Sequence, residues 1–263
     1  MGDWYVRPAV LGLAVVSLVS PGILRKPHTW LALAVLTAWR IAADWPLADN
    51  HIYLLGYWCL AAAIGLRKGE PPMSLKTSGR YLIGLAFACA VAWKLILSPD
   101  FIDGRFFRVT LLTDPRLVGA AQLVGGLTDA EIEANRQALE PLPEGAQRLE
   151  PLPIVESARL RGFAMAATWG VLLLEAAVAA LMLLPNRPLI EAARHVSLLT
   201  FCFTTYAFAP VAGFGWLLLV MGAVQVRSSQ RWLRNTYIGA FVVVLFYSEI
   251  PWSGMVLDLF RTA

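Results

Sequence analysis

The stretch that decides the fold runs from Gly162 to Leu184 and reads GFAMAATWGVLLLEAAVAALMLL. It carries a single charged side chain, Glu175, among its 23 residues. A helix rises ~1.5 Å per residue and the hydrocarbon core of a bilayer is ~30 Å thick, so about 20 apolar residues are enough to cross it. This stretch therefore predicts a membrane-spanning helix.

Seven further stretches are almost as apolar. Apolar residues make up 58% of the chain and charged residues 15%, whereas a soluble domain is about a quarter charged. The eight predicted spans are Trp4 to Leu24, His28 to Ala43, His51 to Leu66, Tyr81 to Ser98, Gly162 to Leu184, His195 to Phe208, Phe214 to Val226 and Tyr237 to Ile250. We therefore expect an all-α, polytopic integral membrane helical bundle of about eight transmembrane segments, forming one domain over residues 1–263.

Several of these spans are shorter than a bilayer is thick, so we expect some of them to be tilted, broken or partly re-entrant. Irregular backbone at membrane depth is tolerated where protein or a water-filled cavity shelters it. The segment from Ala209 to Gly213 contains Pro210 and predicts a tight hairpin between two short helices. The first span follows Asp3 rather than a basic segment, so it predicts a retained helix and not a cleaved signal.

Positive charge alternates along the connections between the predicted spans. The first, third, fifth and seventh connections together hold eleven Lys or Arg and two acidic residues. Because basic connections stay in the cytoplasm, we expect both termini to lie outside it, in a multi-pass protein of a bacterial inner membrane. This placement explains the net charge of +4, which does not indicate nucleic-acid binding. The three cysteines all fall within apolar spans and are expected to be small core residues.

The connection at about 99–161 is the one long extramembrane segment that we expect, on the outer side. Its first part, Pro99 to Arg108, alternates aromatic, basic and apolar residues, which predicts a helix in the headgroup region. Thr128-Asp129-Ala130-Glu131 predicts a capping box that starts a helix ending near Leu139. Leu-Glu-Pro-Leu-Pro then occurs at Leu139 to Pro143 and again at Leu149 to Pro153. The prolines predict an extended strap, which either covers an outward-facing pocket or forms a rigid surface loop.

Three ionisable residues, Lys94, His51 and Glu175, lie within the predicted spans. Burying an ionisable side chain in a bilayer costs free energy, so each of them is a functional candidate. Lys94 lies about four residues from the end of its span, so it either snorkels to the headgroups or acts as a desolvated, neutral base. His51 follows Asn50 at the start of the third span, and these two residues either cap the helix or serve a site. Both are expected on the outer side, as Lys94 is.

Glu175 is the deepest ionisable residue. It lies roughly 20 Å along its helix from Arg161, so we expect it to be too far from Lys94 for a direct pair unless the helices tilt strongly. A role in helix packing and a catalytic role both remain open for it. The chain has no HExxH, Walker or GxGxxG motif and no histidine pair at metal-ligand spacing, so we expect no metal. A haem between two of the three histidines has no motif to support it.

Short motifs resemble a known family. Asp49-Asn50-His51-Ile52-Tyr53-Leu54 resembles the Asn-His-x-Tyr-Leu motif of the vitamin K-dependent γ-carboxylases and their HTTM-domain relatives. Lys94-Leu95 followed by Phe101-Ile102-Asp103-Gly104 is similar to that family's Lys-Leu and aromatic-apolar-acid-Gly stretch, with two extra residues between the halves. Leu172-Leu173-Leu174-Glu175 resembles its leucine-rich helix with one embedded acid. The resemblance covers roughly Trp30 to Val226. This chain stops at Ala263, so we expect it to lack the carboxylases' C-terminal soluble domain.

The resemblance implies an outward-facing site that uses a reduced naphthoquinone, menaquinol or vitamin K hydroquinone. In the family a neutral lysine deprotonates the hydroquinone, whose product with oxygen removes a γ-proton from a glutamate side chain before CO₂ is captured. Carried onto this chain, Lys94 is the catalytic base and His51 assists it. The residues that the resemblance places at the cofactor are Asn50, Tyr53, Asp103 and Glu175.

Three functions stay open at this point. The first is a quinone-dependent, carboxylase- or epoxidase-like lyase that takes a quinone or another lipid-like ligand from the outer leaflet. The second is a non-catalytic membrane subunit or scaffold that binds a membrane or periplasmic protein partner through its outer loop. The third is a small transporter, for which the sequence shows no clear inverted repeat. An enzyme predicts a cavity that touches both Lys94 and His51, whereas a scaffold predicts that these side chains are exposed or filled in.

Overall fold

The computed structural model describes residues 3–46, 48–69, 71–114, 117–140, 142, 154–208, 212–247 and 255. Within these ranges the chain is all-helical and contains no strand. The first four long helices are α1 (Asp3–Val19), α2 (Pro27–Ala43), α3 (Asn50–Arg67) and α4 (Pro71–Ile96), with the short 3-10 helix η1 (Pro21–Arg25) between α1 and α2. The remaining helices are α5 (Pro99–Ile102), α6 (Arg105–Thr113), α7 (Val118–Gly125), α8 (Asp129–Leu139), α9 (Ala158–Leu183), α10 (Pro188–Phe208), α11 (Ala212–Gln225) and α12 (Arg231–Tyr247).

Each predicted span overlaps one long helix, namely α1, α2, α3, α4, α9, α10, α11 or α12, and the first span also runs into η1. The main differences lie at the starts of α4 and α10, which begin ten and seven residues earlier than the spans predicted from Tyr81 and His195. Hydropathy marks the apolar part of a helix, whereas backbone hydrogen bonding continues through the polar turns before it. Of the predicted hairpin, residues 209–211 lie outside the described residues, whereas Ala212 and Gly213 start α11. The strap with its two repeats lies almost entirely outside the described residues.

Two described helices are long and apolar enough to cross a membrane by length and composition. They cover Met73–Ile96 and Ala158–Leu183. The others are shorter or less apolar, so the count of eight spans does not follow from helix length and composition. The structure thus establishes a helical protein with two candidate membrane spans.

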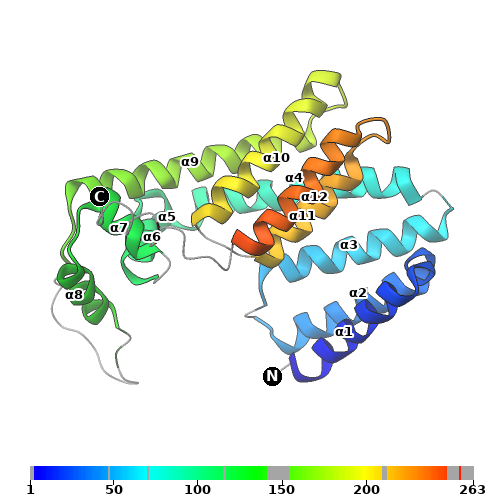
Figure 1. The fold of residues 1–263 in the computed structure, drawn as a ribbon, viewed down its shortest axis with the longest axis horizontal. Helices are drawn as coiled ribbons and strands as arrows, with labels where there is room; N and C mark the ends of the chain where they lie inside the picture. The colour runs from blue at the N-terminus through cyan, green and yellow to red at the C-terminus, as the bar shows by residue number, and fades with distance from the viewer. Residues whose placement is uncertain are drawn as a thin grey trace.

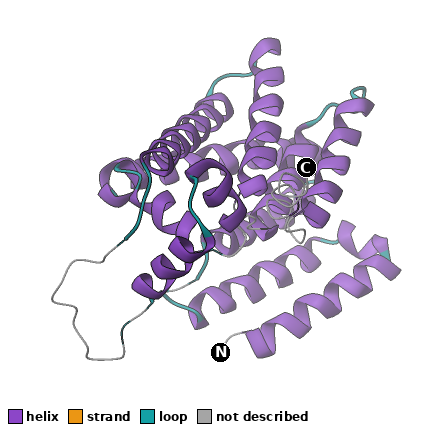
Figure 2. Cartoon of the chain, turned by 60° about the vertical axis from the view of Figure 1, so that its left-hand side comes forward, coloured by secondary structure: helices purple, strands orange, loops and turns teal. Residues whose placement is uncertain are grey.

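The main core lies where α4, α9, α10, α11 and α12 meet, with α3 along one side (Figure 1). Its largest fully buried side chains include Phe87, Met182, Leu198 and Tyr237. Helices α4 and α9 run side by side in opposite directions. A glycine permits their close approach, because a Cβ on Gly84 would lie 2.9 Å from the side chain of Leu183. Helices α1 and α2 form a separate hairpin against α3 (Figures 1 and 2).

The helices between α4 and α9 form a second core. Helices α6, α7 and α8 gather around the first turns of α9, at the left of Figure 1. Leu112, Ala121, Ile132 and Leu160 are almost fully buried there. The single helix predicted over Pro99 to Arg108 is wrong: it is broken into α5 and α6 at Gly104, which has φ 77°. Such a positive φ suits glycine and ends the first helix.

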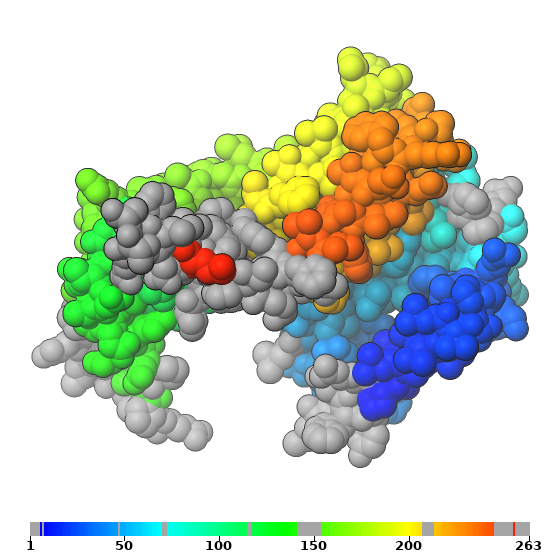
Figure 3. Space-filling view, viewed as in Figure 1, coloured from blue at the N-terminus to red at the C-terminus, as the bar shows by residue number. Residues whose placement is uncertain are grey.

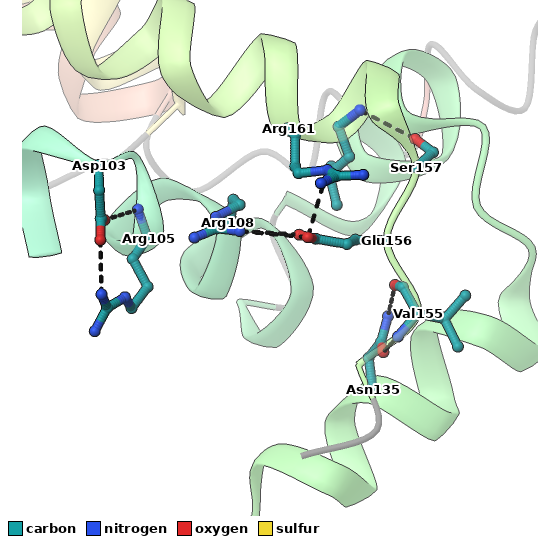
Figure 4. A network of polar contacts seen from close by, with 9 residues as sticks. Asp103, Arg105, Arg108, Asn135, Val155, Glu156, Ser157 and Arg161 are labelled. Atoms are coloured by element: carbon teal, nitrogen blue, oxygen red, sulfur yellow. Dashed lines mark hydrogen bonds and ion pairs between the residues drawn. The ribbon is translucent and has the colours of Figure 1, made fainter. Parts of the chain in front are cut away.

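The segment before α9 is held by polar contacts (Figure 4). The side-chain amide of Asn135 on α8 donates to the carbonyl of Val155 and accepts from its N–H, each at 2.7 Å. The carboxylate of Glu156 pairs with Arg108 on α6 at 3.3 Å and with Arg161 on α9 at 3.5 Å. On α8 itself, the predicted capping box between Thr128 and Glu131 is confirmed, with the helix ending at Leu139 as predicted.

Candidate functional site

Lys94 and Glu175 form an ion pair between the two longest helices. The Nζ atom of Lys94, near the end of α4, lies 2.5 Å from both carboxylate oxygens of Glu175 on α9. The two side chains are 21% and 8% exposed, respectively. A charged pair at this level of burial is shielded from the solvent that weakens surface pairs. In this position each group balances the charge of the other.

The prediction that Glu175 lies too far from Lys94 for a direct pair is wrong. That prediction assumed that the end of α4 and the start of α9 lie at the same depth along the bundle. In the structure α9 starts well beyond the end of α4, and its first turns pack against α6 and α7 instead (Figure 1). A Cβ on Gly104 would lie 3.5 Å from the backbone of Met165, so the connection after α4 already lies beside the second turn or so of α9. This offset brings Glu175 level with the last turn of α4.

An aromatic cluster covers the same end of α4. The Lys94 ammonium lies 4.8 Å from the ring centroid of Phe101, at a distance that suits a cation–π contact. Phe101 is buried, and its ring centroid lies 5.5 Å from Phe106 and 5.8 Å from Phe107. Phe101 belongs to the stretch that the family resemblance selected, although the resemblance gave this ring no role. The pair thus lies between two helices under an aromatic cover.

His51 lines a different part of the molecule. Its side chain faces an apolar groove of about 820 Å³ between the α1–α2 hairpin, α3 and the start of α11. Helix α1, dark blue in Figure 3, forms the outer edge of the bundle at this groove. A Cβ on Gly213 of α11 would lie 3.3 Å from the His51 ring, so this glycine leaves room for the imidazole. Arg40 of α2 also lines the groove, at the end of α2 where the chain turns back toward His51.

Lys94 does not line this groove, and no hydrogen bond joins it to His51 among the described residues. The structure therefore brings Lys94 together with Glu175 and brings His51 together with Arg40. Sequence reasoning gave Arg40 no role at the site, although a visible signal was present: it is the one Lys or Arg within the predicted span from His28 to Ala43. A charge in that position is expensive unless it lines a polar site.

The other candidate residues take surface positions. The prediction that Asn50 is a helix N-cap is wrong, because Asp49 is the N-cap of α3 and Asn50 is its first helical residue. Asn50 is exposed and Tyr53 is half-buried, and neither lines the groove. Asp103 lies in the exposed turn between α5 and α6, where it accepts hydrogen bonds from the backbone N–H and the guanidinium of Arg105. The backbone hydrogen bond holds the pKa of Asp103 below its usual value, and the Arg105 charge adds to this.

No group of three His, Cys, Asp or Glu residues among the described residues is placed to hold a metal ion. Cys59 and Cys202 are buried and Cys89 is exposed, and all three are free thiols. The chemistry that the described residues offer is therefore an acid–base pair, an imidazole and a guanidinium beside an apolar groove.

No family model, curated protein or solved structure matches this chain.

Proposed function

We propose that this chain is a multi-pass membrane protein that binds a quinone in the groove between α1, α2, α3 and α11. The observation that carries the proposal is an apolar groove of about 820 Å³ with His51 and Arg40 on its wall. Sites for small ligands typically measure about 300–1,000 Å³, with apolar walls and a few polar groups that fix the orientation. A quinone ring with an isoprenoid tail has this chemistry, because it joins two hydrogen-bonding oxygens to a long apolar chain.

Exposed apolar side chains support the membrane part of the proposal. In the 18-residue windows of the two candidate spans, only 22% and 33% of positions are buried, whereas the core helix of a soluble protein is mostly buried. Trp93 on α4, Leu173 on α9 and Val243 on α12 are 61%, 66% and 47% exposed. Large apolar patches on a soluble monomer are unfavourable, whereas lipid solvates them. We therefore propose that α1, α2, α3, α10, α11 and α12 also lie in the bilayer. The membrane is a bacterial inner membrane, and both termini lie outside the cytoplasm.

His51 and Arg40 lie at the outer end of the groove in this orientation. His51 starts α3, Arg40 lies in the last turn of α2, and Val6 lies near the start of α1. From there the groove follows α1 to Leu18, a length of ~18 Å. We place the quinone ring beside His51, where the imidazole and guanidinium hydrogen-bond its oxygens, and the tail along α1. This route opens the site to the outer leaflet, as the family resemblance implies.

The test is binding of menaquinone-4 by the purified protein in nanodiscs, measured by extraction and absorbance at increasing quinone concentration. We expect one quinone per chain, with affinity lowered at least tenfold by Gly213→Val, which fills the groove beside His51. His51→Leu is expected to weaken binding as well. Gly162→Val is the matched control, because nothing lies within 4 Å of a Cβ at that position. Equal binding by Gly213→Val and the control would place the quinone elsewhere. If a phospholipid occupied the groove and quinone did not displace it, the groove would be a lipid-binding surface and not a quinone site.

A second candidate function is favoured by the Lys94–Glu175 pair. An HTTM-type, γ-carboxylase-like enzyme needs an amine that can accept a proton, and Glu175 can hold the extra proton of Lys94 while it does so. A reduced quinone would supply the reaction with oxygen, and Nζ would take up the proton of its hydroxyl group. This function requires the quinone ring to reach Lys94, which does not line the groove.

Oxygen uptake with menaquinol tests this second function. Turnover that falls at least a hundredfold in Lys94→Ala but stays unchanged in Lys68→Ala would support the base. If the wild type bound quinone but showed no turnover, the protein would be a quinone-binding protein without this enzymatic activity. Capture of a periplasmic partner by the outer helices α5 to α8, independent of quinone, would favour the scaffold alternative instead.

A further inference from the structure

The opposite end of the bundle holds a basic cavity that the proposed quinone site does not use. It has a volume of about 150 Å³ and lies between the first turns of α4, the start of α10 and the end of α11. Its wall includes Lys76 and Arg80 of α4, Asn186 of the α9–α10 connection, and Arg194 of α10. In the proposed orientation this is the cytoplasmic end. This volume leaves room for a small polar group.

Arg194 is the fixed part of this cavity. It is 3% exposed, and its guanidinium donates to the carbonyls at the end of α9, with its Nε 2.6 Å from the oxygen of Leu181. It also donates to the side-chain oxygen of Asn186 at 2.5 Å. These acceptors are neutral, and within the described residues no carboxylate forms an ion pair with Arg194. Glu191 attracts it from the same cavity but is itself paired with Arg227. A buried charge is costly without an opposite charge nearby.

Lys76 and Arg80 each have hydrogen-bond donors that no acceptor of the described residues satisfies. Lys76 makes no hydrogen bond or ion pair within the described part of the chain. The Nη1 atom of Arg80 donates to Asn186 at 2.7 Å, but its Nε is buried and has no acceptor. A buried donor without a partner costs about 1–3 kcal/mol, so such atoms indicate an acceptor that is absent from the protein itself.

Glu191 is the acidic residue among the described residues that line the cavity, and it limits what can bind. One of its oxygens pairs with Arg227 at 2.5 Å, which balances its charge from outside the cavity. Its other oxygen, Oε1, is buried and has no donor. The cavity therefore has a surplus of positive charge on one side and an unfilled acceptor on the other. His195 on the same wall is occupied, because its Nδ1 lies 2.9 Å from the hydroxyl of Tyr237.

We infer that this cavity binds a phosphate group that carries a neighbouring hydroxyl or ammonium group. The phosphate oxygens accept hydrogen bonds from Lys76 and Arg80, and the neighbouring donor reaches Oε1 of Glu191. Charge-assisted bonds of this kind are the strong ones in phosphate recognition. Lipid headgroups such as phosphatidylglycerol and soluble molecules such as glycerol phosphate share this chemistry. Basic pockets between helices at the cytoplasmic side are typical sites for anionic headgroups.

The test measures the thermal unfolding midpoint of the purified protein in detergent at constant ionic strength. The additives are dioctanoyl phosphatidylglycerol, dioctanoyl phosphatidylcholine and glycerol 3-phosphate. We expect phosphatidylglycerol to raise the midpoint more than phosphatidylcholine does, since the two share acyl chains and differ in the headgroup. A rise with glycerol 3-phosphate as well would identify a soluble phosphate as a ligand, and a rise with phosphatidylglycerol alone would identify the lipid.

Lys76→Gln is the decisive variant because it breaks no hydrogen bond or ion pair of the described residues, although it removes a charge that attracts Glu191. We expect it to need at least tenfold more ligand for the same rise in midpoint, with Lys76→Arg restoring the response. Lys68→Gln removes an equal charge from an exposed position outside the cavity and is expected to respond as the wild type does. An equal response of Lys76→Gln and Lys68→Gln would overturn the inference, as would the lack of any response in the wild type. Quinone binding is unaffected by either result, so this inference and the proposed function fail separately.

Discussion

The Nζ atom of Lys94 lies 2.5 Å from both carboxylate oxygens of Glu175, although the two residues are 81 positions apart in the chain. The pair joins the last turn of α4 to the middle of α9. It is the ionic contact between the two described helices that are long and apolar enough to span a bilayer. Loss of one partner would leave the other charge in a site from which most solvent is excluded.

We predict that Glu175→Gln and Lys94→Met each destabilise the protein by about 2–3 kcal/mol. Removing one member of a fully buried pair typically costs about 3–5 kcal/mol, and the partial exposure of Lys94 reduces this. The double variant Lys94→Met/Glu175→Leu should recover most of the loss, because it leaves no unpaired charge. Reversible unfolding in detergent, followed by tryptophan fluorescence, measures all three.

A matched control for this cycle is the exposed pair of Arg105 and Asp103, whose side chains are 58% and 41% exposed. Arg105→Ala should change stability little, since solvent and salt screen such a pair. If the two single variants at Lys94 and Glu175 behaved like this control, the pair would not be buried in the folded protein. If the double variant were as unstable as the singles, the loss would come from packing and not from charge.

Local features of this fold could be predicted from the sequence, whereas contacts between distant segments could not. The apolar stretches located eight helices because hydropathy is a property of consecutive residues. The capping box at Thr128 and Glu131 was also predictable, since its partners are three residues apart. The Lys94–Glu175 pair was not, because it depends on how far α9 slides past α4. The first turns of α9 extend beyond the end of α4, where they pack on α6 and α7.

The groove beside His51 could not be predicted for a similar reason. Its walls come from α1, α2, α3 and α11, and no pattern within one helix says which neighbours it leaves open. Helix α7 was missed because Val118 to Gly125 is short and rich in small residues, which give no amphipathic pattern. The basic cavity did leave a trace in the sequence, because Lys76, Arg80 and Arg194 are among the charges of the connections that we predict to be cytoplasmic. Only the fold brings them to one cavity.

We predict that Asn135→Leu loosens the segment that leads into α9. Asn135 is fully buried, and its amide makes two hydrogen bonds of 2.7 Å with the backbone of Val155. Leucine has a similar size but leaves both backbone groups without a partner. Hydrogen exchange at the Val155 amide should accelerate at least tenfold, while exchange in the α4–α9 core stays unchanged. Gln137→Leu is the control on the same helix, because its side chain bonds to Glu133 at the surface. Equal exchange in both variants would mean that Asn135 does not hold this segment.

We predict that the first turn of α8 loses protection in acid. The backbone N–H of Thr128 lowers the pKa of Glu131 from its ordinary value of 4.5, and the Thr128 hydroxyl adds to this. A carboxylate with a lowered pKa in the folded state contributes stability above pH 4.5, and that stability disappears as the pH falls through the folded value. Hydrogen exchange of the α8 amides should therefore show an acid transition centred below pH 4.5. Glu131→Gln should abolish the transition and Glu133→Gln should keep it. A transition that persists in Glu131→Gln would assign it to another group.

Gly222 on α11 provides a test of the main core that does not depend on membrane topology or on any ligand. A Cβ at this position would lie 2.5 Å from the ring of Tyr237 and 2.9 Å from Leu198. The Tyr237 ring cannot easily move away, because it is 1% exposed and its hydroxyl lies 2.9 Å from the Nδ1 atom of His195. We therefore predict that Gly222→Ala destabilises the protein by about 1–3 kcal/mol, as overpacked cores do.

The control is Gly239→Ala on the neighbouring helix α12, where nothing lies within 4 Å of the added Cβ. Alanine is favoured over glycine within a helix by about 1 kcal/mol, so this variant should be as stable as the wild type or more stable. The two substitutions add the same methyl group to two helices in contact, and only the surroundings differ. Unfolding midpoints in the same detergent compare them directly. Equal midpoints would show that α11 and α12 do not approach each other as closely as Gly222 and Tyr237 do here. A stable Gly222→Ala variant with altered fluorescence would instead indicate that the Tyr237 ring can be displaced and that its hydrogen bond to His195 is weak.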